Sequence, residues 1–203
     1  MLIVDENAGA AAAHGAAWGI LIAMSSLTAD QATFLLESVG LPALRFEHPL
    51  TSAVIAAIPA ERAGHKPHPD SRTALDLAWH IVSAEIKYIE ATAAGVFPHE
   101  LKPIPEAVRT PSDVVGWYQE RFAPAVERLE KTTGDELLRI VDFYGLRQFP
   151  AVALIQIIVN HTIHHRGQLS TYLRPMGAKV PSIYGPSYDA GGFAGGTVRP
   201  AAR

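Results

Sequence analysis

The chain has 203 residues, of which 48% are hydrophobic and 18% charged, which is enough apolar material for a buried core. Its 17 Lys and Arg stand against 20 Asp and Glu, a balance without the basic excess of nucleic-acid-binding or membrane-surface proteins. The absence of cysteine excludes disulfides, iron–sulfur clusters, thiolate zinc sites and a cysteine nucleophile. Any metal must therefore have nitrogen or oxygen ligands, and any thiol must come from a bound small molecule.

Residues 8–24 are small and apolar, as in the central part of a signal peptide. However, Asp5 and Glu6 precede them and the first basic residue is Arg45, whereas a secretory signal needs a positive leader. The stretch is also too short for a membrane span, and glycines interrupt it. We therefore expect a poorly ordered extension over residues 1–27 and a cytoplasmic protein, with no membrane or nucleic-acid partner.

The rest of the chain reads as helical almost throughout. Capping boxes at Thr28 and Thr110 mark two helix starts, while Gly40, Pro59 and Gly95 mark helix ends. Apolar residues at helical spacing predict helices over about 28–39, 43–58, 71–94, 111–132, 135–142 and 150–174. These elements predict an all-α protein, a single antiparallel four-helix bundle over 28–189 with extra short helices. Residues 190–203, rich in glycine, are expected to form a flexible tail.

The last long helix carries the densest chemical signal. His161 and His165 are four residues apart and so lie on one face, one turn from each other. Gln168 continues that face, and His164 lies about 100° round from His165. Two imidazoles at this spacing can converge on one cation, although a hydrogen-bonded, half-buried histidine pair is an equally good reading of the spacing alone.

A metal would need a third ligand from another helix, and His80 is the best candidate. It lies in the middle of a helix beside Trp79, where an unpaired imidazole would be costly to bury. Taken alone, a buried histidine with an ordinary hydrogen bond remains the commoner outcome. Asp76 shares its face and could support a ligand or act as a base. For Asp76, as for Glu47 and Glu85, a surface position is the default expectation.

The chain resembles the DinB-like (damage-inducible) superfamily of metal-binding four-helix bundles. The most specific match runs from His161 through His165, Arg166, Gly167 and Gln168 to Leu169. Looser matches lie upstream and downstream of it, at residues 57–61, 66–69, 77–81, 172–177 and 180–185. Together these pieces cover about residues 44–189, and they support the same bundle that the helix pattern predicts.

The resemblance implies a divalent metal bound by His80, His161 and His165, with open positions for water or substrate. It gives Arg166 and Gln168 no ligand role. Gln168 could hydrogen-bond a bound group, His164 would support the ligands or serve the fold, and Arg166 would form a salt bridge or a dimer contact. Three neutral imidazoles suit zinc, nickel, iron, cobalt or manganese.

Some DinB-like relatives are transferases or isomerases that use a metal to ionise a low-molecular-weight thiol. A metal-dependent thiol transferase acting on a small-molecule substrate is therefore the first expectation. A hydrolase using water, or a non-enzymatic stress protein that binds a metal or small ligand, are the alternatives. The family and the aromatic residues that could be exposed also suggest a homodimer.

Overall fold

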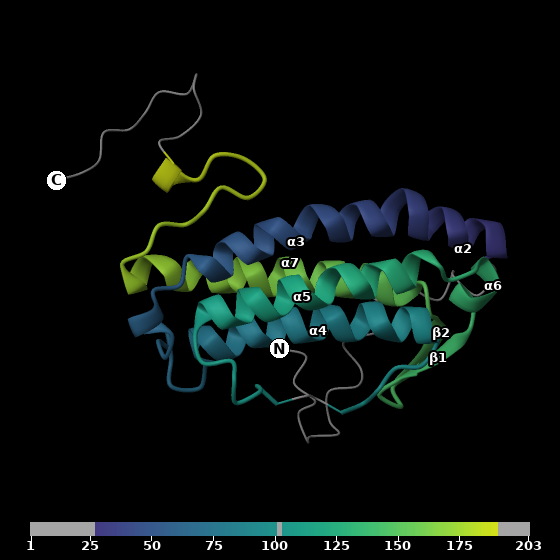
Figure 1. Ribbon diagram of the computed structural model, residues 1–203, viewed down its shortest axis with the longest axis horizontal. Coiled ribbons are helices and arrows are strands. Elements are labelled where there is room, and N and C mark those ends of the chain that lie inside the picture. Colours follow the sequence, from purple (N-terminus) through teal and green to yellow (C-terminus); the bar gives the residue numbers. More distant parts are fainter. Residues whose placement is uncertain (1–26, 101–102, 191–203) are drawn as a thin grey trace, which may run out of the picture.

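The computed structural model describes residues 27–100 and 103–190, in which four long helices lie side by side in one bundle (Figure 1). In chain order the elements are α2 (Ala29–Leu35), η2 (Leu36–Gly40), α3 (Leu41–Ala56), η3 (Ala60–Arg62), α4 (Ala74–Ala94), α5 (Pro111–Glu130), α6 (Gly134–Leu137), β1 (Ile140–Phe143), β2 (Arg147–Pro150), α7 (Ala153–Leu173), η4 (Arg174–Met176) and η5 (Tyr188–Ala190). The predicted helical bundle is confirmed. The predicted extension and tail lie outside the described residues, apart from Leu27 and Ala190.

The first bundle helix is longer than its sequence suggests. Gly40 does not end a helix: α2 continues through a π-helical turn, η2, directly into α3. Such a turn accommodates Pro42, which has no amide hydrogen to donate. Gly40 has an ordinary helical φ of −67° and packs so closely on α7 that an added Cβ would lie 2.8 Å from Ile155 Cγ2. Close helix packing, rather than helix termination, therefore explains this glycine.

Hydrogen-bonding side chains begin α4 and α5. The hydroxyl of Thr110 accepts a hydrogen bond from the amide of Asp113, whose carboxylate accepts one in return, as the capping box predicts. Thr73 caps α4, so this helix begins at Ala74 and not at about residue 71 as the sequence predicts. Gly95 ends that helix in the left-handed conformation with φ of +68°, which glycine adopts at little cost.

The helices are not all antiparallel to their neighbours in sequence. Arg128 of α5 pairs with Glu90 near the end of α4, and Trp117 contacts Trp79 near its start. The two helices therefore run in the same direction, and the described parts of the connection between them lie outside the bundle (Figure 1). Short loops force neighbours to be antiparallel, but the long connection over residues 95–110 removes that constraint.

A β-hairpin replaces the helix expected up to Asp142. Strands β1 and β2 pair antiparallel at one end of the bundle, with Phe143 opposite Arg147. Tyr144 and Gly145 in its turn have φ of +57° and +66°, and the Asp142 carboxylate accepts a hydrogen bond from the Gly145 amide. The sequence has no Asn-Gly or Asp-Gly pair here, which would have indicated such a hairpin, and positive φ is uncommon for a tyrosine. The hairpin was therefore not predicted.

The core lies between the four long helices. Around the bundle α3 is followed by α5, then α4, then α7, which packs on α3 again. Large side chains that are fully buried there include Leu44, Ile55, Leu77, Ile81, Ile89, Leu129, Leu154 and Ile158. Within the described part of the chain, every helix is too short or too polar to cross a lipid bilayer. The pair α4 and α7 carries the three candidate ligands His80, His161 and His165.

Candidate metal centre

Three histidines meet between α4 and α7. His80 comes from α4, while His161 and His165 lie one turn apart on α7. The Nε2 atoms of His80 and His161 are 3.1 Å apart, and one ring nitrogen of each histidine lies within 4.8 Å of the other two. The structure thus brings together the three residues that the sequence singled out. Their role as ligands remains a prediction.

Burial keeps these imidazoles neutral. His165 is only 3% exposed, and His80 and His161 are half-buried. Desolvation is the largest effect on each ring: it lowers the pKa of His80 and of His165 to about 4 and that of His161 to about 2. At neutral pH all three therefore carry an unprotonated ring nitrogen, which is the form that binds metals.

Gln168, for which we expected a hydrogen bond to a bound group, contacts His165 itself. Its side-chain oxygen lies 2.9 Å from His165 Nδ1 and can only accept a hydrogen bond, so Nδ1 carries the ring proton. The lone pair is then on Nε2. His161 differs, because its buried Nδ1 has no hydrogen-bond partner among the described residues. The imidazole ring of His161 stacks on the ring of Tyr88, with the two ring centroids 6.3 Å apart.

The other two expected supporting residues lie differently. His164 is exposed and touches only the edge of the centre, with its ring 4.8 Å from that of His165. The Asp76 carboxylate accepts a hydrogen bond from the Thr73 hydroxyl at 2.6 Å, and the backbone amide of Asp76 donates one to the oxygen of that hydroxyl. These contacts place Asp76 in the N-terminal cap of α4 and give it no hydrogen bond to His80.

Arg72 adds a positive charge near the centre. Arg72, an exposed residue just before α4, adds to the lowering of the pKa of both His80 and His165. Three neutral imidazoles would leave a bound divalent ion its full charge, so with Arg72 nearby the centre would attract anions when loaded.

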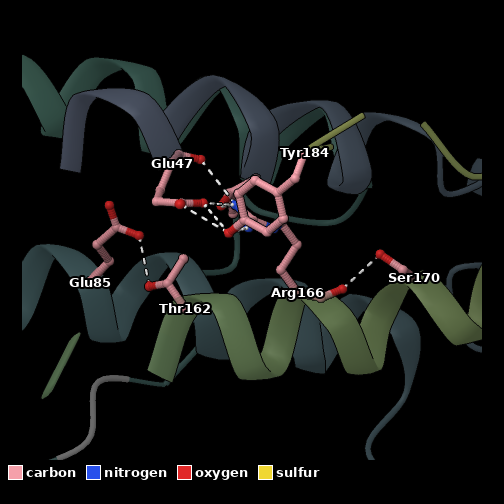
Figure 2. Close-up of polar contacts among 7 residues, drawn as sticks. Glu47, Glu85, Thr162, Arg166, Ser170 and Tyr184 are labelled. Carbon is pink, nitrogen blue, oxygen red and sulfur yellow. Dashed lines mark hydrogen bonds and ion pairs between the residues drawn. The ribbon is translucent and has the colours of Figure 1, made fainter. Parts of the chain in front are cut away.

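A buried ion pair lies on the other side of α7 (Figure 2). Arg166, only 1% exposed, contacts Glu47 of α3 with Nη1 2.5 Å from Oε2. The hydroxyl of Tyr184 donates to the Glu47 carboxylate at 2.9 Å and accepts from Arg166 Nη2 at 2.5 Å. Thr51 Oγ1 lies 3.3 Å from Arg166 Nη1. Arg166 thus forms a salt bridge, one of the two roles expected for it, and Glu47 is not the surface carboxylate that we expected by default.

A second carboxyl group, Glu85, is buried in α4. It accepts a hydrogen bond from Thr162 at 2.9 Å (Figure 2), and burial raises its pKa to about 7. Tyr118 lies close enough to affect that pKa, but its hydroxyl and Glu85 Oε1 both lack a partner of hydrogen-bond geometry among the described residues. The default expectation of a surface position is therefore wrong for Glu85 too. Its place between Val82 and Ile86 was a signal for burial.

The other histidines that the structure describes do not join the centre. His65 packs against the edge of Tyr172, and His68 accepts a hydrogen bond from the amide of Asp70 in the same loop. His48 stacks on Phe122, with ring centroids 3.8 Å apart. Among the described residues, His80, His161 and His165 alone form a group of metal-ligating side chains.

The donor set fits a divalent transition metal. All three donors are neutral imidazole nitrogens, and the contact between Gln168 and His165 is the kind that orients a ligand ring. Two half-buried nitrogens 3.1 Å apart, in rings that burial keeps uncharged, suit a shared cation. These residues can therefore hold zinc, nickel, iron, cobalt or manganese.

Two uncharacterized proteins of Bacillus subtilis strain 168 are similar in sequence to this chain. Over 115 residues the chain is 31% identical to the uncharacterized protein YrdA of Bacillus subtilis strain 168, covering 56% of this chain and 66% of YrdA, just under two thirds. Over 130 residues it is 27% identical to the uncharacterized protein YjoA of the same strain, covering 63% of this chain and 82% of YjoA.

Two crystal structures show the same fold. A DinB-like protein from Bacillus cereus ATCC 10987 superposes with a TM-score of 0.60 at 27% identity, covering 73% of this chain and 97% of its own. The DinB-like protein YjoA from B. subtilis gives 0.58 at 23% identity, covering 71% and 96%. The DinB family model matches residues 41–192, which include all three clustered histidines. This chain therefore belongs to the DinB family.

Proposed function

We propose that this protein is a metal-dependent enzyme that transfers a low-molecular-weight thiol to an electrophilic small molecule. The observation that carries the proposal is the convergence of three neutral imidazoles from α4 and α7, His80, His161 and His165. A divalent ion held by them would retain its full charge and lower the pKa of a thiol or water.

Residues around the centre support an anionic nucleophile. Arg72 places a positive charge near His80 and His165, which favours a thiolate and the carboxylates that small cellular thiols carry. Gln168 holds the ring of His165 in one tautomer, and buried Tyr88 covers His161 and excludes water from that side. Since the chain has no cysteine, the thiol must be supplied from solution.

The reaction is a substitution. The thiol loses its proton to solvent, its sulfur forms a bond to an electrophilic carbon, and the leaving group departs with the electrons of the bond that breaks. Arg72 would bind the thiol in this scheme, and the chain supplies no covalent nucleophile of its own.

Purified protein loaded with zinc, nickel or manganese should be tested with glutathione, bacillithiol and mycothiol against a chromogenic aryl chloride. We expect a metal-dependent rate that saturates with one of the thiols and is lost in His161→Ala. Metal-dependent hydrolysis of esters or amides without a thiol would assign a hydrolase instead. Metal binding without either activity would leave a metal- or ligand-binding stress protein.

We also propose a cytoplasmic homodimer. Phe34, Val39 and Phe46 are about half exposed or more on α2, η2 and α3, and large apolar side chains of this kind are often covered by a partner. Light scattering on the purified protein measures the mass, and a monomer at micromolar concentration would contradict the dimer.

A further inference from the structure

On α7, each clustered histidine is followed by a polar residue that points into the bundle. Thr162 follows His161 and Arg166 follows His165, and both are 1% exposed. Successive residues of a helix point about 100° apart, so α7 presents the histidines to His80 and the two polar side chains to the core. Figure 2 shows Thr162 and Arg166 reaching toward carboxyl groups on two other helices.

The contact of Thr162 joins the same two helices that carry the histidines. Its hydroxyl donates to Glu85 Oε2 at 2.9 Å, and Glu85 lies on α4, five residues after His80. Both side chains are buried, so no water competes for this hydrogen bond. It therefore fixes how α4 and α7 are aligned, one residue away from His161.

The contacts of Arg166 join α7 to a third helix. Arg166 pairs with Glu47 of α3 and lies within 3.3 Å of the Thr51 hydroxyl, and Tyr184 bonds to both members of the ion pair. An arginine–carboxylate contact is directional, unlike apolar packing, so it resists rotation and sliding of the helix. This restraint lies one residue away from His165.

We propose that Thr162, Glu85, Arg166 and Glu47 are positioning residues, which hold α7 in the single rotation and register that brings His161 and His165 to His80. Metal sites need their ligands held to about half an ångström, and directional contacts of core side chains add to packing in providing that precision. The proposal rests on the proposed metal centre. It predicts that a small change at Thr162 weakens metal binding although Thr162 touches no metal.

The test compares Thr162→Val, which keeps the shape but loses the hydroxyl, with Thr162→Ser, which keeps the hydroxyl. Leu129→Ala, a core cavity on α5, serves as a control for lost stability. Zinc affinity is measured by competition with a chromophoric chelator, and the cobalt-loaded proteins are compared by visible absorption. We expect roughly 10–100-fold weaker zinc binding and an altered cobalt spectrum for Thr162→Val, with wild-type values for Thr162→Ser and Leu129→Ala.

Wild-type affinity and spectrum in Thr162→Val would overturn the proposal, as would an equal loss in Leu129→Ala. A second measurement separates this outcome from failure of the metal centre itself. The ring-nitrogen NMR shifts of His80 and His161 in metal-free protein should change in Thr162→Val and remain in Thr162→Ser. Unchanged shifts would overturn positioning even if the wild type bound no metal.

Discussion

The side-chain oxygen of Gln168 lies 2.9 Å from Nδ1 of His165 and holds the ring proton on that nitrogen. Nε2 is then free to bind a metal. We expect Gln168→Leu to weaken metal binding roughly 10–100-fold, the usual effect of losing a partner that orients a ligand histidine. Gln168→Glu keeps an accepting oxygen and should bind at least as well as the wild type. Competition with a chromophoric chelator measures both affinities, and equal affinity of Gln168→Leu and wild type would contradict this role.

Arg72 should affect the binding of an anionic substrate. Removing its charge in Arg72→Ala is expected to raise KM for the thiol roughly tenfold with little change in kcat, because a charge-assisted contact is lost. The KM of the variant should also depend less on salt. Arg62→Ala, which removes an exposed arginine of the short helix η3, is the control. A KM that rises equally in both variants would show a general charge effect and not a contact of Arg72.

Glu85 makes folding depend on pH. Its pKa is about 7 in the folded protein against an ordinary 4.5, so between these values the folded protein binds the proton more tightly than the unfolded chain. The contribution of Glu85 to stability is therefore greatest below pH 4.5 and is lost as pH rises toward 7. Glu85→Gln should remove this slope, which is at most about 1.4 kcal/mol per pH unit.

Urea denaturation of wild type and Glu85→Gln at several pH values between 4.5 and 8 provides the measurement. The difference in unfolding free energy should shift in favour of the glutamine variant as pH rises. A difference that stays constant over this range would mean that Glu85 keeps an ordinary pKa in the folded protein.

Two glycines should respond in opposite ways to alanine. Gly40→Ala would place a Cβ 2.8 Å from Ile155 Cγ2, and overpacking of this kind costs about 1–3 kcal/mol. Gly116 lies within α5, where an added Cβ would meet nothing within 4 Å, so Gly116→Ala should add about 0.5–1 kcal/mol. Urea unfolding midpoints measure both changes. Stabilisation by Gly40→Ala would contradict the close contact between this first bundle helix and α7.

Local signals allowed much of this fold to be predicted. The caps at Thr28 and Thr110 depend on residues three positions apart, and both form as the sequence predicts. The shared face of His161 and His165 likewise follows from helix geometry alone. Their meeting with His80, by contrast, depends on how α4 and α7 pack, and it was expected chiefly from resemblance to a family.

The features that the sequence did not predict depend on contacts between residues far apart in the chain. Gly40 lies within a continuous helix, and Ile155, far along the sequence, packs closely against it. Glu47 and Glu85 are buried because Arg166 and Thr162 reach them from another helix, a pairing that no local pattern reveals. The parallel course of α4 and α5 similarly follows from a long connection whose path is set by packing.

The most direct test of the metal centre is the metal content of untagged protein by elemental mass spectrometry, after loading with zinc, nickel or manganese. We expect about one ion per chain in the wild type and in His68→Ala, an exposed loop histidine, and loss of that ion in both His80→Ala and His165→Ala. That result would establish a centre shared by α4 and α7. A wild type without stoichiometric metal, or His80→Ala that retains it, would contradict the account.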